Sequence, residues 1–261
     1  MRRELAVKVF AVSDVHVDYQ ANAAWVEGLS LTEHRRDVLI LAGDISDSLP
    51  RLERCFDALA LRFRQVLFVP GNHDLWVARD NAAPDSLQKF EQVRAAAARS
   101  GVSMSPFHHG RLTIVPLLGW YDFSFGLPGA DLLKTWADFR ACRWPEGFDA
   151  ARITAHFLAM NRYQRRDEAE TIISFSHFLP RVDLMPAGVP EHVAALFPVF
   201  GTHQLEPQIR LLRSKIHIYG HSHLNRNLVI DGIRYVNNAF AYPSETRIAA
   251  KALACIFETD E

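Results

Sequence analysis

The side chains best suited to chemistry gather in five short motifs, and each motif follows a short apolar run. Four of them are Asp14-Val15-His16, Gly43-Asp44, Gly71-Asn72-His73-Asp74 and Gly220-His221-Ser222-His223, and the fifth is His177. Short runs rich in Val, Ile, Leu and Phe are typical of buried strands. Ligands of open α/β sheets bind beyond the carboxyl ends of the strands. We therefore expect five strand ends to deliver aspartate, asparagine and histidine side chains to one edge.

The spacing within these motifs suits metal coordination. Residues i and i+2 of an extended segment point to the same side, so Asp14 and His16 can present their side chains together, as can His221 and His223. Glycines precede three of the candidate ligands and allow sharp turns and close backbone approach. The donors are nitrogen and oxygen without thiolate. This set suits Mn, Fe, Zn, Co or Ni better than Mg or Ca.

The number of candidate ligands indicates two metal ions. Six or seven ligands exceed the four of a tetrahedral zinc site, but they fit two ions that share a bridging carboxylate roughly 3.5–4 Å apart. Two dications carry four positive charges. Asp14 and Asp44 return two negative charges, and a bridging hydroxide returns a third. The positive charge that remains would attract a phosphate anion.

Taken in order, the five motifs resemble the signature motifs of the calcineurin-like metallophosphoesterase superfamily. They run from residue 14 to residue 223, and although each is weak alone, the ordered set is specific. The resemblance implies an α/β fold, a four-layer α/β/β/α sandwich with two facing mixed sheets and a dinuclear metal site at the strand ends. It also implies hydrolysis of a phosphate mono- or diester by in-line attack of a metal-bridging hydroxide.

The resemblance further implies a role for each motif residue. Asp14, His16 and His223 would hold one metal, and Asn72, His177 and His221 the other. Asp44 would bridge the two ions. His73 would lie just outside the metals and assist the leaving group, and Asp74 would orient the His73 ring. We expect two divalent transition-metal ions as cofactors, with manganese favoured.

Two further residues are candidates for substrate contact. Arg181 follows His177 closely and is a candidate phosphate ligand, and His203 follows Gly201-Thr202 and is a candidate for the metal edge. An arginine cluster (Arg162, Arg165 and Arg166) is interpreted as a solvated helical face.

Alternative functions use the same residues differently. A nuclease or nucleotide phosphodiesterase could bind bases on the aromatic and arginine side chains of 119–170. The formal net charge of −1 argues against a general nucleic-acid binder. A non-catalytic metal-binding scaffold is disfavoured because every ligand and His73 are present. The His73-Asp74 pair also occurs in helical HD-type phosphohydrolases, but here it follows an apolar run and a Pro-Gly turn.

The elements that must position these residues can be outlined from the apolar pattern. Strands are predicted at 7–12, 38–42, 66–69, 112–117, 172–175 and 216–219, with a hairpin at 228–236 and a last strand at 252–257. Helices are predicted at 52–63 and 86–100. Alternation of strand and helix indicates a layered α/β fold.

The stretch 119–170 differs from the rest of the chain because it is rich in aromatic residues and matches none of the motifs. We interpret it as an insertion packed on a single domain that spans 1–261, helical in its second half. Its aromatics are expected to form the core of the insertion, with a substrate cap as the alternative.

Composition limits the class of protein. With 261 residues, 49% of them hydrophobic, the chain can bury a sizeable core. Its three cysteines are widely spaced and form no disulfide framework, which predicts a reduced, cytoplasmic protein. No signal peptide and no membrane span is predicted. The expected partner is a small-molecule phosphoester, and the sequence does not indicate which one.

Overall fold

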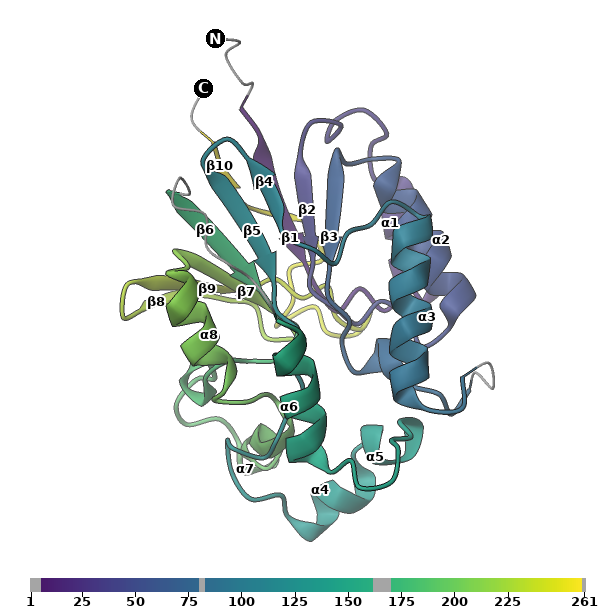
Figure 1. Cartoon of the computed structure of the whole chain (residues 1–261), viewed down its shortest axis with the longest axis vertical. Helices are drawn as coiled ribbons and strands as arrows, with labels where there is room; N and C mark the ends of the chain where they lie inside the picture. Colours follow the sequence, from purple (N-terminus) through teal and green to yellow (C-terminus); the bar gives the residue numbers. More distant parts are fainter. Residues whose placement is uncertain (1–5, 80–82, 162–169, 260–261) are drawn as a thin grey trace.

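Two β-sheets lie face to face, and helices cover the outer face of each sheet (Figure 1). The computed structural model describes residues 6–79, 83–161 and 170–259. The strand order is β10-β1-β2-β3 in the first sheet and β4-β5-β6-β7-β9-β8 in the second. The predicted four-layer α/β/β/α architecture is therefore confirmed.

The first sheet is built from β1 (Lys8–Val12), β2 (Val38–Leu41), β3 (Gln65–Phe68) and β10 (Ala254–Glu258). Strands β1, β2 and β3 are parallel, and β10 pairs antiparallel with β1. The carboxyl ends of the three parallel strands consequently meet at one edge.

The second sheet contains β4 (Phe107–His109), β5 (Leu112–Pro116), β6 (Thr171–Phe175), β7 (Ile216–Tyr219), β8 (Arg226–Ile230) and β9 (Ile233–Asn237). Strands β5, β6, β7 and β9 run parallel, whereas β4 and β8 are antiparallel edge strands. Both sheets are thus mixed, as predicted.

Each strand of the first sheet sends alternate side chains to opposite faces, as the period of a strand requires. In β2, Val38 and Ile40 enter the layer between the sheets and share it with Ile173 of the second sheet. Leu39 and Leu41 face the helices instead. The covering helices are α1 (Gln20–Gly28), α2 (Leu49–Ala60) and α3 (Ser86–Arg99).

The outer face of the second sheet is covered by α6 (Ala150–Met160) and α8 (Leu205–Leu212), as Figure 1 shows. Shorter turns of helix accompany them: α4 (Ala130–Thr135), α5 (Asp138–Ala141), α7 (Glu191–Ala194), η2 (Val182–Leu184) and η3 (Phe197–Val199). The aromatics Trp120 and Phe157 of the 119–170 stretch pack in the same core as Phe178. They form a shared core with the sheet.

Some elements differ from the sequence-based expectation. Helices α1 and α8 and the short edge strand β4 were not predicted, although they are present. The expected helix in the second half of 119–170 is represented by α6. The arginine cluster of Arg162, Arg165 and Arg166 lies outside the described residues. Within the described part of the chain, no helix is both long and apolar enough to span a bilayer.

Candidate metal centre

The loops that leave the parallel strands carry all seven predicted metal ligands, and they meet where the two sheets lie together. Five of these ligands have a left-handed backbone, with φ between 45° and 68°: Asp14, His16, Asp44, His221 and His223. Non-glycine residues adopt this conformation at a cost, and such residues cluster at functional sites. The backbone strain is therefore concentrated where the candidate ligands lie.

Glycines next to the ligands are required by close approach. A Cβ on Gly71 would lie 2.1 Å from Asp44 Oδ1, and a Cβ on Gly43 would lie 2.5 Å from His177 Nδ1. Both distances are far below van der Waals contact. The loops after β2 and β3 can pack on the His177 ring only because these two positions have no side chain.

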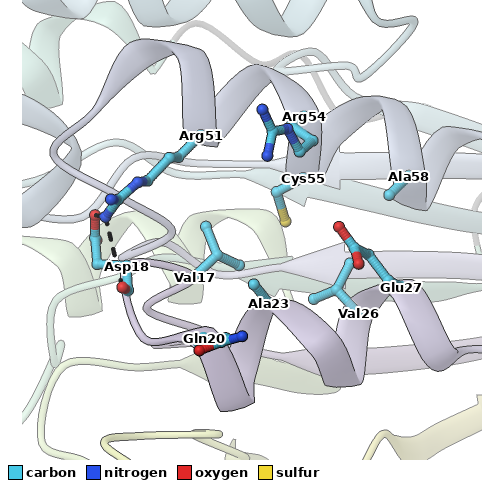
Figure 2. Close-up of a pocket in the computed structure, with 10 residues that line it drawn as sticks. All are labelled: Val17, Asp18, Gln20, Ala23, Val26, Glu27, Arg51, Arg54, Cys55 and Ala58. Carbon is cyan, nitrogen blue, oxygen red and sulfur yellow. Dashed lines mark hydrogen bonds and ion pairs between the residues drawn. The ribbon is translucent and has the colours of Figure 1, made fainter.

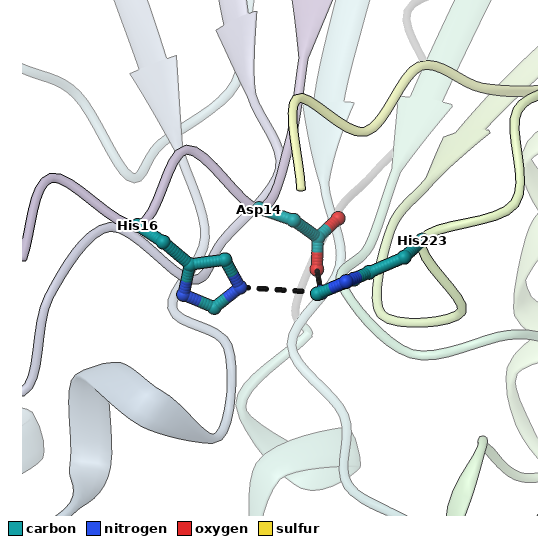
Figure 3. Close-up of side chains that lie close together, drawn as sticks. All are labelled: Asp14, His16 and His223. Carbon is teal, nitrogen blue, oxygen red and sulfur yellow. Dashed lines mark hydrogen bonds and ion pairs between the residues drawn. The ribbon is translucent and has the colours of Figure 1, made fainter. Parts of the chain in front are cut away.

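The first ligand cluster consists of Asp14, His16 and His223 (Figure 3). The Nε2 atoms of His16 and His223 are 3.2 Å apart, and His223 Nε2 is 3.4 Å from Asp14 Oδ1. On its other side, His223 Nδ1 donates to Glu245 Oε2 at 2.7 Å. Glu245 thereby fixes the ring so that Nε2 faces the cluster.

The second ligand cluster consists of Asp44, His177 and His221, with Asn72 beside them. His177 Nε2 is 3.1 Å from His221 Nδ1, 3.2 Å from Asn72 Oδ1 and 3.5 Å from Asp44 Oδ1. All four side chains belong to buried residues. Asp44 also lies 4.0 Å from His16 Nε2, so it adjoins the first cluster as well.

The hydrogen bonds of the second cluster leave it two facing lone pairs. His177 Nδ1 donates to the Ala42 carbonyl at 2.9 Å, and His221 Nε2 donates to the Val199 carbonyl at 3.0 Å. Each neutral ring therefore turns its unprotonated nitrogen toward the other. Two lone pairs 3.1 Å apart repel each other unless a cation lies between them, so these residues fit a bound metal ion.

The electrostatics of the site favour the same interpretation. Burial lowers the pKa of His177 and His221, which keeps both rings neutral and able to bind a metal. Burial and the neighbouring carboxylates Asp14 and Asp74 raise the pKa of Asp44 well above its usual range. This carboxylate needs added positive charge nearby to remain ionised.

The first cluster has a different charge pattern. Burial, together with the charge of His223, lowers the pKa of His16 to about 3. Burial also opposes the charged form of His223, but the carboxylates of Asp14 and Glu245 outweigh it and raise its pKa to about 9. This part of the site therefore also draws positive charge.

His73 lies at the open side of the site. Its backbone N–H donates to Asp44 Oδ1 at 2.9 Å, and its ring Nε2 lies 3.9 Å from Asp44 Oδ2. The ring stacks on Trp76 with centroids 3.7 Å apart, and its side chain is 18% exposed. Burial, with the nearby His16, lowers its pKa well below the usual range, so the free ring is neutral.

The predicted role of Asp74 is wrong. Its two oxygens accept backbone N–H groups from Asp44, Ile45, Ser46 and Gly71 at 2.8–3.0 Å. Within the described residues, no hydrogen bond joins the Asp74 carboxylate to the His73 ring. Burial raises the pKa of Asp74 to about 6, although the four backbone donors oppose this shift. Asp74 therefore joins the loops after β2 and β3 through hydrogen bonds to their backbone N–H groups.

The two weaker substrate-contact predictions are not supported by the geometry. Arg181 pairs with Asp183 at 2.7 Å, Asp231 at 3.1 Å and Glu206 at 3.2 Å, so its guanidinium is occupied by carboxylates. Asp231 lies in the β8–β9 turn, at the end of β9 opposite the ligand loops. His203 is exposed, packs its ring on Phe125 and joins neither ligand cluster. Tertiary contacts thus give both side chains other partners, and substrate contact by either residue stays a prediction.

Three residues that contact the site were missed from the sequence. Glu245 holds His223, and the Tyr242 ring packs on His16 at 4.6 Å and on His223 at 4.8 Å. Asp138, from the 119–170 stretch, accepts from Asn72 Nδ2 at 2.8 Å. None of these residues lies in a ligand motif, so no local pattern could have identified them.

A separate cavity of about 220 Å³ lies between α1 and α2 (Figure 2). Its wall includes Asp18, Arg51 and Cys55 but none of the candidate ligands. Arg51 Nη1 pairs with Asp18 Oδ1 at 3.1 Å, and Asp18 also accepts from Ser46 Oγ at 2.8 Å. These contacts support the loop that follows His16.

A two-sheet sandwich with two adjoining nitrogen and oxygen ligand clusters at its strand ends defines a class of metal-dependent hydrolases. Comparison with known families gives the same answer: residues 7–225 match the family described as calcineurin-like phosphoesterase. The chain belongs to this family, and it is a metal-dependent enzyme that hydrolyses phosphoric esters.

A similar protein from Mycobacterium tuberculosis, PptH, appears in both the sequence and the structure comparison. The chain is 27% identical to the acyl-carrier-protein phosphodiesterase PptH over 263 aligned residues. This alignment covers 92% of this chain and 79% of PptH. The crystal structure of phosphopantetheinyl hydrolase PptH superposes with a TM-score of 0.79 and 23% identity, over 96% of each chain. The fold is therefore shared along nearly the whole length.

Proposed function

We propose that the chain is a phosphodiesterase that works with two divalent transition-metal ions. One ion would be held by Asp14, His16 and His223, the other by Asn72, His177 and His221, with Asp44 shared. The facing lone pairs of His177 and His221 carry this proposal, because only a cation makes their 3.1 Å separation favourable. Manganese is favoured by the mixed nitrogen and oxygen donors.

The residues divide the work of hydrolysis between them. When bound, the metal pair supplies Lewis-acid chemistry by lowering the pKa of water and neutralising charge on phosphoryl oxygens. Water adds to phosphorus, the ester P–O bond breaks, and the departing oxygen gains a proton. His73 lies on the open side of the site, where its ring stacks on Trp76. The anionic diester favours the imidazolium form of His73, which protonates the leaving oxygen, and the attacking water supplies the proton that restores the ring.

The proposed substrate is the phosphodiester that joins phosphopantetheine to an acyl carrier protein. Support comes from the relative that shares 27% identity over 92% of this chain and is described as an acyl-carrier-protein phosphodiesterase. The expectation of a small-molecule partner is widened to a diester carried on a protein. A cytoplasmic location and a single domain over 1–261 stay predictions.

Mass spectrometry tests the substrate directly. Phosphopantetheinylated acyl carrier protein is incubated with the enzyme and Mn²⁺, and the carrier is expected to lose the mass of its prosthetic arm. Bis(p-nitrophenyl) phosphate serves as a parallel probe of diesterase activity. Turnover of this probe alone would reject the carrier-protein substrate. A lack of turnover with either substrate, under any transition metal, would reject the proposed function.

A further inference from the structure

The Asp138 carboxylate is the meeting point of several site residues, although it lies in the 119–170 stretch. Asp138 opens α5 and is 2% exposed. Its Oδ1 accepts from Asn72 Nδ2 at 2.8 Å and from Trp76 Nε1 at 2.6 Å, and its Oδ2 accepts from Trp136 Nε1 at 2.7 Å. The Tyr121 side chain lies close to the same carboxylate. Asn72, Trp76 and Trp136 all donate to it.

A carboxylate is the side chain that suits this position. Ionised aspartate only accepts hydrogen bonds, so Asn72, Trp76 and Trp136 can all donate to it at once. Among the residues that the structure describes, no lysine or arginine pairs with Asp138. The charge is instead met by charge-assisted hydrogen bonds, which are stronger than neutral ones.

The contact with Asn72 decides which way that amide faces. A side-chain amide has a donor end and an acceptor end that differ little in shape. The donor end of Asn72 is held by Asp138, so its Oδ1 must face His177 Nε2, 3.2 Å away. If the amide turned over, an NH₂ group, which cannot bind a metal, would occupy that place.

The same carboxylate holds two aromatic rings beside the site. Trp76 stacks on His73 at 3.7 Å, and the Trp136 ring lies 6.0 Å from the His221 ring. Both indoles are anchored by their N–H groups to Asp138. Through these two indoles, Asp138 is linked to the candidate ligand His221 and to the candidate leaving-group residue His73.

We propose that Asp138 is a positioning residue that fixes the Asn72 amide with its oxygen toward the second metal ion, and so makes the 119–170 stretch part of the metal centre. This proposal rests on the proposed ligand role of Asn72. Asp138 itself touches no metal in this arrangement and acts through its neighbour.

The variant Asp138→Asn tests the proposal without changing side-chain size. The NH₂ group of the new asparagine must face at least one N–H donor in either orientation, because both oxygens of Asp138 accept such donors. The hydrogen bond that restrains Asn72 is therefore expected to weaken. Chelator-treated protein is titrated with Mn²⁺ by calorimetry, and affinity for one of the two ions, the one that Asn72 would hold, is expected to fall about 10–100-fold. The matched control is Trp136→Phe, which removes a different donor to Asp138 and is expected to keep the parent affinity. Melting of each metal-free variant checks that it is folded.

A second pair of variants gives a readout that a merely structural role would not move. Asn72→Asp keeps a ligand oxygen, but its second oxygen replaces the Nδ2 atom that lies 2.8 Å from Asp138 Oδ1. The two carboxylates then repel each other, so Mn²⁺ binding is expected to weaken. Adding Asp138→Asn restores a donor between the two positions. The same substitution is thus expected to weaken binding in the parent and to improve it in Asn72→Asp.

Two outcomes would overturn the proposal: parent-like affinity in Asp138→Asn, or an equal loss in Trp136→Phe. A substitution effect of the same sign in both backgrounds would also overturn it. The proposed function fails in a different way, because the parent protein itself would then bind no metal or hydrolyse no phosphodiester.

Discussion

Asp44 is the side chain that adjoins both ligand clusters. One of its oxygens lies 3.5 Å from His177 Nε2 and the other 4.0 Å from His16 Nε2. Asp44→Ala is therefore expected to lose both metal ions and all activity together, as elemental analysis and a diesterase assay would show. The exposed Asp57 is the control position, and Asp57→Ala should retain about two ions per chain. Retention of one ion by Asp44→Ala would contradict a shared ligand.

His73 is expected to affect turnover more than metal binding. Its ring lies 3.9 Å from Asp44 but packs on Trp76 at the open side. His73→Ala should keep both ions and slow kcat by about 10²–10⁴-fold, because a general acid contributes on this scale. The loss should be larger for alkyl esters than for p-nitrophenyl esters, whose leaving group needs less help. An empty metal site in this variant would show that His73 is a ligand.

Glu245 is expected to act through the His223 ring. The same oxygen, Oε2, accepts from His223 Nδ1 at 2.7 Å and from the Tyr242 backbone N–H at 2.9 Å. Glu245→Ala removes both bonds, and Mn²⁺ affinity measured by calorimetry should fall about 10–100-fold. Glu245→Gln keeps one carbonyl oxygen for both donors and should fall less. Equal losses would show that the charge of Glu245 matters and the hydrogen bond does not.

The residues that the sequence predicted and those that it missed differ in how they are specified. The ligands stand in local motifs directly after strands, so their convergence follows from strand direction. Glu245 lies 22 positions from His223, and Asp138 lies 66 positions from Asn72. Only the packed fold creates these pairs. The role of Asp74 was mispredicted because its sequence neighbour His73 turns outward in η1 (His73–Leu75), while the carboxylate turns toward the backbone.

At the scale of the elements, the glycine turns after β2 and β3 set how closely the loops approach. A Cβ on Gly71 would lie 2.1 Å from Asp44 Oδ1 and 2.7 Å from His177 Nε2. Gly71→Ala is expected to displace both ligands and to lower metal content and activity at least tenfold. Gly28 at the end of α1 is the control, because nothing lies within 4 Å of its added Cβ. Parent-like metal content in Gly71→Ala would show that the loop can move aside.

The strands were predictable because buried runs of Val, Ile and Leu are short and end at polar turns. The predicted run 216–219 coincides with β7, and 38–42 differs from β2 by one residue. Helix α1 gave no signal because only Asn22 and Val26 along it are buried. Helix α8 contains Pro207, which is tolerated in a first turn but indicates a break in the sequence. Tertiary burial decides such elements more than local preference does.

At the scale of the whole molecule, the two sheets contribute ligands to one centre. Asp14, Asp44 and Asn72 follow strands of the first sheet, whereas His177 and His221 follow strands of the second. The remaining two ligands are His16, which follows β1 in the first sheet, and His223, which follows β7 in the second. A bound metal pair therefore ties the two sheets together at this edge. Metal binding should contribute to global stability as well as to catalysis.

Removal of metal is thus expected to lower the melting temperature. A ligand that binds only the folded state adds about 2.7 kcal/mol when its free concentration is about 100 times Kd, which for a chain of this size is on the order of 5–10 °C. Scanning calorimetry of chelated protein, repeated with rising Mn²⁺, should show this gain and a continued rise with concentration. Asp44→Ala should melt at one temperature regardless of Mn²⁺, because it lacks the shared ligand. A Mn²⁺-dependent rise that persisted in Asp44→Ala would mean that the ions bind elsewhere, and the two sheets would then be held together by their apolar interface alone.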